Sequence, residues 1–172
     1  PHRCAYRARL PLPLPTSAPR AVLTFGLSLL IFHFTFLIML VSVVLPTYHE
    51  AANLPALVPR LGGALAEHGY AYEILVVDDD GGDGMDAAVA RLAGDYPVRL
   101  ITRTGTRGLA SAVLTGFRQA RGDILLVMDA DLSPPPEIAP LLVGRILDDG
   151  CDFALGSRFV DGGGAPDFHW AR

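Results

Sequence analysis

Acidic residues follow two apolar segments of this 172-residue chain. The triplet Asp129-Ala130-Asp131 comes directly after the apolar run Asp123–Met128. Two carboxylates with one small residue between them can hold a hard cation such as Mg²⁺ or Mn²⁺, which prefers oxygen ligands and often binds through one or two carboxylates plus substrate phosphates. The alternative is a pair of ordinary solvated loop aspartates. Asp78 and Asp79 form a second acidic cluster. Because unneutralised carboxylates close together repel, two such clusters favour a ligand site.

Asp79 is the candidate for binding a nucleoside. A carboxylate just past a strand can accept hydrogen bonds from a ribose or a base, as it does in dinucleotide-binding folds. The alternative for Asp78 and Asp79 is turn formation and capping of the next helix, for which Asp83 is better placed. We favour ligand binding for Asp79.

Tyr48 and Glu50 follow the first apolar run. Tyr48 is expected to lie over a base, and Glu50 is expected to accept a hydrogen bond from the nucleoside. Glu50 can also favour the N-terminus of the following helix through its dipole, and both roles can hold.

Three arginines are candidates for binding phosphate, because arginine contacts phosphate oxygens in bidentate fashion. Arg103 and Arg107 follow the third apolar run, and Arg158 follows the fifth. For Arg103, solvated surface charge is the default interpretation. For Arg158, at a predicted strand end opposite the aspartates, a functional role is expected.

The elements that must position these residues alternate between two periodicities. Five apolar runs predict buried strands: Val41–Leu45, Glu73–Val77, Val98–Thr102, Asp123–Met128 and Phe153–Gly156. Helical spacing of apolar residues predicts four helices between them, around 54–65, 85–92, 109–120 and 138–146. Pro55 suits the first turn of the first helix better than its interior. Alternating strands and helices predict an α/β fold with a mainly parallel sheet and helices on both faces. Ligands then bind beyond the carboxyl ends of the strands.

Residues 1–40 differ from the rest, and residues 41–172 are expected to form the catalytic domain. The first twenty residues are rich in proline and arginine, and Ala21 to Leu40 is almost wholly apolar, long enough to span a bilayer as a helix. The pattern also resembles a signal sequence. However, preceding arginines would hold the N-terminus in the cytoplasm and send the next domain outside, away from any nucleotide-sugar donor. An extension upstream of the natural start is the third interpretation.

Composition excludes several classes of protein. The chain is 51% apolar and 19% charged, which argues against global disorder, and its net charge of −4 argues against a nucleic-acid binder. Cys4 and Cys151 have no zinc-site or disulfide-framework spacing. No Gly-x-Gly-x-x-Gly follows the first strand, which argues against a nicotinamide dehydrogenase.

In this order, the motifs resemble those of the family 2 glycosyltransferases, which have the Rossmann-like GT-A fold. The similarity is greatest to the branch that transfers mannose to dolichyl or polyprenyl phosphate. It is carried by seven stretches: Val43–Pro55, Glu73–Asp79, Arg107–Phe117, Ala120–Asp123, Met128–Leu132, Pro135–Glu137 and Gly156–Phe159. It covers roughly Val41 to Arg172 and not the preceding residues.

The resemblance implies a role for each matching residue. The nucleoside would be held by Pro46, Tyr48, Glu50, Val77 and Asp79. The diphosphate and a Mg²⁺ or Mn²⁺ ion would be held by Asp129, Ala130 and Asp131, with Ser133 as a weak ligand and Arg158 on phosphate. The implied reaction moves a hexose, most readily mannose from GDP-mannose, to a polyprenyl or dolichyl phosphate with inversion, at the cytoplasmic face of a membrane.

The chain departs from the family pattern at three places. Gly81 and Met85 stand where relatives commonly have Ser and Thr, and Ser133-Pro134 stands where they usually have Gln-His. The chain ends at Arg172, where relatives begin their acceptor-binding region, so we expect it to be C-terminally truncated. Two alternatives stay open: the same fold with UDP-glucose or a saccharide acceptor, and a non-catalytic nucleotide-sugar-binding subunit.

Overall fold

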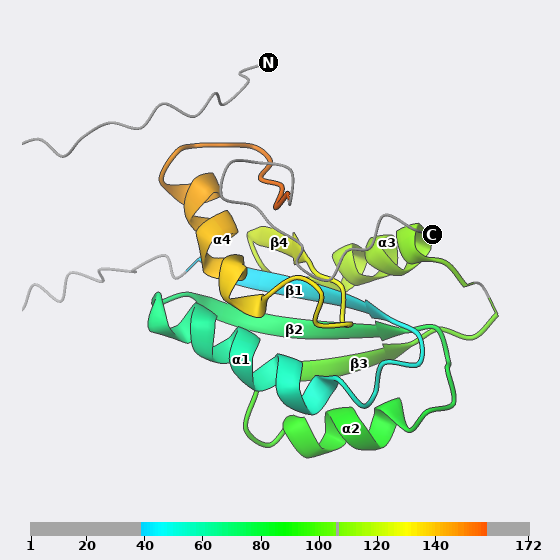
Figure 1. The fold of residues 1–172 in the computed structure, drawn as a ribbon. Coiled ribbons are helices and arrows are strands. Elements are labelled where there is room, and N and C mark those ends of the chain that lie inside the picture. The colour runs from blue at the N-terminus through cyan, green and yellow to red at the C-terminus, as the bar shows by residue number, and fades with distance from the viewer. Residues whose placement is uncertain (1–38, 106, 158–172) are drawn as a thin grey trace, which may run out of the picture. The chain divides into compact units, whose positions relative to one another are not determined.

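The computed structural model describes residues 39–105 and 107–157 (Figure 1). All of them belong to one of the two units into which the chain divides, Leu37–Arg172. The predicted N-terminal apolar segment lies outside the described residues except for its last two positions, and Leu40 already begins the first strand. Arg158 and Arg172 also lie outside them.

Four parallel strands form one sheet in the order β3-β2-β1-β4. They are β1 (Leu40–Thr47), β2 (Ala71–Asp78), β3 (Val98–Thr102) and β4 (Ile124–Val127). The central strands are near-continuous apolar runs that are buried along most of their length, as expected when helices cover both faces. The predicted α/β fold with a parallel sheet is therefore confirmed, and four of the five predicted strands are present.

Helices cover both faces of the sheet (Figure 1). The helices α1 (Leu54–Glu67), α2 (Met85–Leu92) and α4 (Ala139–Leu147) pack on one face, and a 3₁₀ turn, η1 (Pro136–Ile138), precedes α4. Helix α3 (Leu109–Gln119) packs on the other face, against β1 and β2. Within the described residues, no helix combines the length and the apolar character needed to cross a membrane.

Helix α1 supplies much of the larger core. Its predicted apolar face is fully buried: Leu54, Leu57, Val58, Leu61 and Leu65. Pro55 lies in the first turn, as predicted, where no intrahelical N–H is required. The helix tolerates a second proline, Pro59, in its interior.

Helix α3 can pack closely on the sheet because it carries a glycine at the contact. A Cβ atom at Gly116 would overlap the side chain of Val44 on β1. Val44 and Val77 form the smaller core with Ala112 of α3, and Phe117 packs against it. Because Gly116 has no Cβ, α3 can approach β1 closely at Val44.

The prediction of a fifth strand at Phe153–Gly156 is wrong, because these residues have no regular secondary structure. Phe153 and Leu155 are 78% and 75% exposed, and they line a cavity of about 640 Å³ beside β4. The hand of the connection disfavours a fifth parallel strand beside β4. Helix α4 lies on the α1 face, so a parallel strand added beyond β4 would need a left-handed crossover, whereas such crossovers are nearly always right-handed.

A buried carboxylate connects the strand starts at the opposite edge of the sheet. Glu73 Oε1 accepts hydrogen bonds from Ser42 Oγ and from the Arg121 amide, both at 2.7 Å, and Arg99 Nε lies 3.5 Å from Oε2. Burial alone would raise the pKa of Glu73, but these hydrogen bonds and the arginine charge together outweigh it. The pKa of Glu73 is therefore held below the ordinary value of a glutamate.

Replacing Gly116 by alanine should destabilise the fold. The added methyl group overlaps Val44, so we expect a loss of about 1–3 kcal/mol in the free energy of unfolding, measured by urea titration. Gly63→Ala is the matched control, because a Cβ there meets nothing within 4 Å. It should be neutral or stabilise α1 by up to about 1 kcal/mol. Equal stability of G116A and the parent protein would contradict the close approach.

Glu73 should make the stability depend on pH in the acidic range. Because its pKa is lowered in the folded state, its contribution is complete above the unfolded value of about 4.3 and is lost as the pH falls through the lower folded value. Glu73→Gln should cost about 1–3 kcal/mol at pH 7. It should also lose less stability than the parent below about pH 4.3. Urea titrations at several pH values test this, with exposed Glu67→Gln as control. An equal loss of stability on acidification in the parent protein and in E73Q would contradict this role of Glu73.

Candidate functional site

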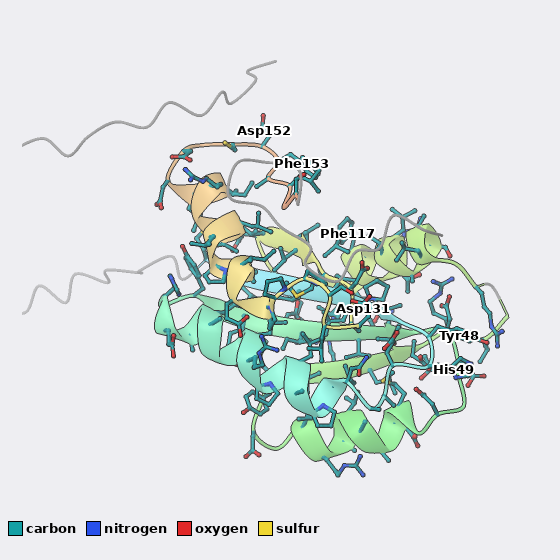
Figure 2. All side chains as sticks on the ribbon, in the orientation of Figure 1. Tyr48, His49, Phe117, Asp131, Asp152 and Phe153 are labelled. Atoms are coloured by element: carbon teal, nitrogen blue, oxygen red, sulfur yellow. The ribbon has the colours of Figure 1, made fainter. Side chains whose placement is uncertain are left out.

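The first three strands end together at one edge of the sheet, and β4 ends next to them. Thr47 pairs with Asp78, Asp78 pairs with Thr102, and β4 ends at Val127 opposite Val44. The loops that follow therefore leave the sheet at its carboxyl edge. Tyr48, His49 and Asp131 lie toward the arrowheads of the strands (Figure 2).

A cavity of about 260 Å³ opens at this edge, between the end of β1 and the start of α3. It is lined by three of the residues proposed to hold a nucleoside, Pro46, Tyr48 and Asp79, together with residues of the α3 approach. Tyr48 is 45% exposed, which leaves much of its side chain accessible to a ligand. We call this cavity the Tyr48–Asp79 pocket.

Val77 and Glu50 do not line the Tyr48–Asp79 pocket. Val77 is fully buried in β2, where it belongs to the small core under α3. Glu50 accepts a hydrogen bond from the Asn53 side chain in the turn before α1. Their predicted contacts with a nucleoside stay predictions.

Asp79 is the most constrained polar residue of the pocket. It is 7% exposed, and its Oδ2 accepts a 2.7 Å hydrogen bond from the Gly108 amide at the start of α3. Arg103 Nη1 lies 3.2 Å from Oδ1 and forms an ion pair with it. A buried carboxylate needs such partners because removing its charge from water is costly. Helix α3 and the end of β2 are thus joined through one side chain.

Arg103 and Arg107 lie beside the Tyr48–Asp79 pocket, and the default interpretation of Arg103 as solvated is wrong. Its side chain is 10% exposed and paired with Asp79. Arg107 Nη1 donates to the Tyr48 hydroxyl at 3.0 Å, and its guanidinium carbon lies 4.7 Å from the centroid of the Tyr48 ring, a cation–π contact. Both arginines thus contact residues of the Tyr48–Asp79 pocket.

The loops after β1 and β2 hold each other in place. Asp83 Oδ2 accepts a 2.8 Å hydrogen bond from the Ala51 amide, and a Cβ at Gly81 would come within 2.9 Å of the His49 amide nitrogen. Asp83 therefore does not cap α2, whose N-cap is Gly84. The absence of a Cβ at Gly81 allows the two loops to touch.

The triplet Asp129-Ala130-Asp131 begins two residues after β4 ends. Ala130 is buried in the main core at 2% exposure, whereas the aspartates on either side of it are exposed. Asp131 accepts two hydrogen bonds from Ser133, from the amide at 2.9 Å and from Oγ at 2.8 Å. Leu132 between them has a φ of 63°. The buried alanine anchors the turn and leaves the two carboxylates in solvent.

The donor set of this turn suits a hard cation. Two carboxylates and the Ser133 hydroxyl offer only oxygen, which is what Mg²⁺ and Mn²⁺ prefer. Among the described residues, no three His, Cys, Asp or Glu side chains gather into a metal-binding group. The remaining ligands would then be phosphate oxygens or water, as is usual for Mg²⁺ at phosphate sites.

Two features of the edge were missed by the sequence analysis. The pairing of Arg103 with Asp79 follows from strand order, since Thr102 pairs with Asp78 and the next residues lie side by side. Consecutive β-α-β units would have suggested that order. The contact between Asp83 and the Ala51 amide carries no periodic signal and needs the loop conformations.

Comparison with known proteins identifies the family. The profile described as glycosyl transferase family 2 matches residues 42–172. The chain belongs to glycosyl transferase family 2. It is 47% identical to a dolichol-phosphate mannosyltransferase of Pyrococcus furiosus over 78% of this chain and 37% of that protein. It is 45% identical to the Saccharomyces cerevisiae dolichol-phosphate mannosyltransferase over 72% of this chain and 46% of that protein. The chain thus spans less than half the length of these curated relatives.

Solved structures of glycosyltransferases share the fold of this family 2 domain. A mannosyltransferase of Pyrobaculum calidifontis, solved with GDP-Man and Mn²⁺, is 33% identical with a TM-score of 0.52, over 62% of this chain and 32% of that chain. Mannosyl-3-phosphoglycerate synthase of Rubrobacter xylanophilus is 23% identical with a TM-score of 0.55, over 66% of this chain and 38% of that chain, and shows the fold alone. The expected GT-A fold is confirmed.

Asp83 should hold the loop after β1 in place. Asp83→Ala removes the acceptor of the Ala51 amide, so we expect hydrogen exchange at that amide to accelerate and stability to fall by about 1 kcal/mol. Exchange measured by NMR tests this, with Asp86→Ala in the first turn of α2 as control. Unchanged protection of the Ala51 amide in D83A would show that the contact does not hold the loop.

Proposed function

We propose that this protein transfers mannose from GDP-mannose to a polyprenyl or dolichyl phosphate, with inversion at the anomeric carbon. The observation that carries the proposal is the shared carboxyl edge of the sheet, where the Tyr48–Asp79 pocket and the Asp129-Ala130-Asp131 turn flank the end of β1. Such an edge can take a nucleoside at one end and a diphosphate at the other. The sequence identity to dolichol-phosphate mannosyltransferases supports the choice of sugar and acceptor.

The nucleoside would occupy the Tyr48–Asp79 pocket. The aromatic ring of Tyr48 offers a stacking surface, and the carboxylate of Asp79 offers hydrogen-bond acceptors. Pro46 forms part of the wall. Val77 and Glu50 would act from behind the pocket, Val77 through the sheet beneath it and Glu50 through the turn before α1.

The diphosphate would lie along the turn after β4. Asp129, Asp131 and the Ser133 hydroxyl would hold a Mg²⁺ or Mn²⁺ ion, with the backbone at Ala130 beside the phosphates. The bound ion supplies neutralisation of the charge that develops on the leaving diphosphate. Arg158 would contact a phosphate oxygen and add positive charge there. The relative solved with GDP-Man and Mn²⁺ supports this combination of donor and metal.

The residues at this edge contribute alignment more than proton transfer. The bond from the anomeric carbon to the donor diphosphate breaks as a bond to an oxygen of the acceptor phosphate forms on the opposite face. That oxygen is already anionic at neutral pH, so no general base is needed. Asp79 and Tyr48 fix the nucleoside and hence the direction of the sugar, which lowers the entropic cost of the displacement.

The acceptor requires the protein to work at a membrane. A polyprenyl chain stays in the bilayer, and its phosphate lies at the surface. The nucleotide-sugar donor is a cytosolic compound, which assigns the reaction to the cytoplasmic face.

A second candidate function is donor binding without transfer. It is favoured by one observation, that both carboxylate oxygens of Asp131 already accept hydrogen bonds from Ser133. A metal would have to compete with that turn. In that case the protein would bind GDP-mannose and would form no mannosylated lipid.

Replacing Asp131 by asparagine tests the proposal. The amide keeps the size of the side chain but removes its charge, so metal-dependent transfer should fall at least about 100-fold. The assay follows radiolabelled mannose from GDP-mannose into an organic extract containing polyprenyl phosphate, with Mg²⁺ or Mn²⁺. The control is Asp95→Asn, an exposed aspartate in the loop between α2 and β3. Near-normal turnover by D131N would reject the metal role. Label transferred from GDP-mannose to a new water-soluble product would point to a saccharide acceptor.

A further inference from the structure

We propose that Arg60 is a positioning residue for the turn after β4, and that it acts through its ion pair with Glu137. Arg60 lies on α1, and Glu137 follows Ser133 by four residues. The pair holds the turn in the conformation in which Asp129, Asp131 and the Ser133 hydroxyl can receive a divalent cation. The inference rests on the proposed function, because it concerns the metal that this function requires.

Arg60 and Glu137 form a bidentate pair between two elements. Arg60 Nε donates to Glu137 Oε1 at 2.8 Å, and Arg60 Nη2 donates to Oε2 at 2.9 Å. Two parallel hydrogen bonds fix the direction of a carboxylate as well as its distance. The hydrogen bond from Arg60 also lowers the pKa of Glu137 below its ordinary value, so the carboxylate is ionised at neutral pH. The pair therefore connects α1 to η1 with a defined geometry.

The arginine end of the pair starts from a fixed backbone. Leu57 and Leu61, on the buried face of α1, have no exposed surface, so the helix is held firmly in the core. The side chains of Arg60 and Glu137 are themselves 48% and 53% exposed. Exposed ion pairs contribute little to stability, although bidentate arginine–carboxylate pairs are an exception. We therefore assign the pair a geometric role whose loss changes metal affinity severalfold rather than by orders of magnitude.

A stiff segment connects Glu137 to the turn after β4. Residues 134–136 are all proline, and they separate Ser133 from Glu137. A proline ring fixes φ near −65°, so a run of prolines acts as a semi-rigid spacer. Ser133 donates two hydrogen bonds to Asp131 from its amide and its hydroxyl. A shift of η1 therefore moves Ser133 and, with it, the Asp131 carboxylate.

The turn needs support from both sides because its middle residue is strained. Leu132 has a φ of 63°, a conformation that a residue with a branched side chain keeps only where its surroundings hold it. On the β4 side, Ala130 is buried in the main core. On the α4 side, Pro136 is buried and η1 contacts α1. Arg60 adds a directional polar contact on this second side.

Charge alone predicts opposite effects for the two partners. Removing the positive charge of Arg60 should strengthen the binding of a nearby cation, and removing the negative charge of Glu137 should weaken it. If the pair positions the turn, the loss of either partner should weaken Mn²⁺ binding. If the pair only stabilises the fold, neither loss should change Mn²⁺ binding by the folded protein. The direction of the Arg60 effect therefore separates the three possibilities.

Electron paramagnetic resonance titration of the whole protein with Mn²⁺ in the presence of GDP tests the inference. Arg60→Gln and Glu137→Gln should each weaken Mn²⁺ binding by about three- to tenfold. The double variant should bind no more weakly than the weaker single variant, because both changes remove the same contact. Arg60→Lys should lose part of the affinity, since the charge remains without the planar fork. Arg91→Gln, at an exposed arginine in the last turn of α2, is the control and should match the parent protein.

Calorimetric titration with GDP in the absence of metal gives a second measurement. The Tyr48–Asp79 pocket is lined by residues around the end of β1 and the start of α3, and neither Arg60 nor Glu137 is among them. The R60Q variant should therefore bind metal-free GDP as the parent protein does. An equal loss of GDP affinity with and without Mn²⁺ would indicate a general loosening of the fold and would overturn the inference.

The remaining outcomes separate the inference from the proposed function. A parent protein that binds GDP but no Mn²⁺ contradicts the proposed metal role and, with it, the inference. A parent that binds Mn²⁺, with an R60Q variant of equal or higher affinity, overturns the inference and leaves the proposed function standing. Additive losses in the double variant would also overturn it. If circular dichroism shows that R60Q does not fold, R60K replaces it, and an unchanged Mn²⁺ affinity of R60K would overturn the inference.

Discussion

The buried carboxylate of Asp79 is the constraint on which the rest of the site depends. It is attached to the end of β2, paired with Arg103 beyond β3 and hydrogen-bonded to the amide that starts α3. A negative charge at 7% exposure is tolerable only with such partners. The ends of β2 and β3 and the start of α3 must therefore meet at one point, and the Tyr48–Asp79 pocket lies there beside the end of β1.

The parallel sheet explains why the two halves of the proposed site lie at one edge. Parallel strands all send their following loops to the same side. The ends of β1 and β2 are level, and β4 ends beside β1 opposite Val44. Periodicity alone predicted the strands and helices well: the third strand, Val98–Thr102, and the second helix have the predicted bounds. The acidic residues at the ends of β2 and β4 were equally visible in the sequence, because each cluster directly follows an apolar run.

Other features depend on information that periodicity does not contain. The predicted strand Phe153–Gly156 has the right residues for a strand, but pairing needs a free edge and a connection of the usual hand. Arg103 was interpreted as solvated because its neighbour in space follows a different strand. The turn in which Ser133 donates hydrogen bonds to Asp131 needs Leu132 in the left-handed backbone region. Leucine rarely adopts that conformation, so the sequence does not predict it. The roles assigned to Val77, Glu50 and Arg158 remain predictions.

A structure of the protein crystallised with GDP and Mn²⁺ would test the central claim most directly. We expect the guanosine to lie in the Tyr48–Asp79 pocket, and an anomalous peak for manganese to lie between the β-phosphate and Asp131. Nucleotide bound away from the carboxyl edge of the sheet, or manganese away from the turn after β4, would contradict it.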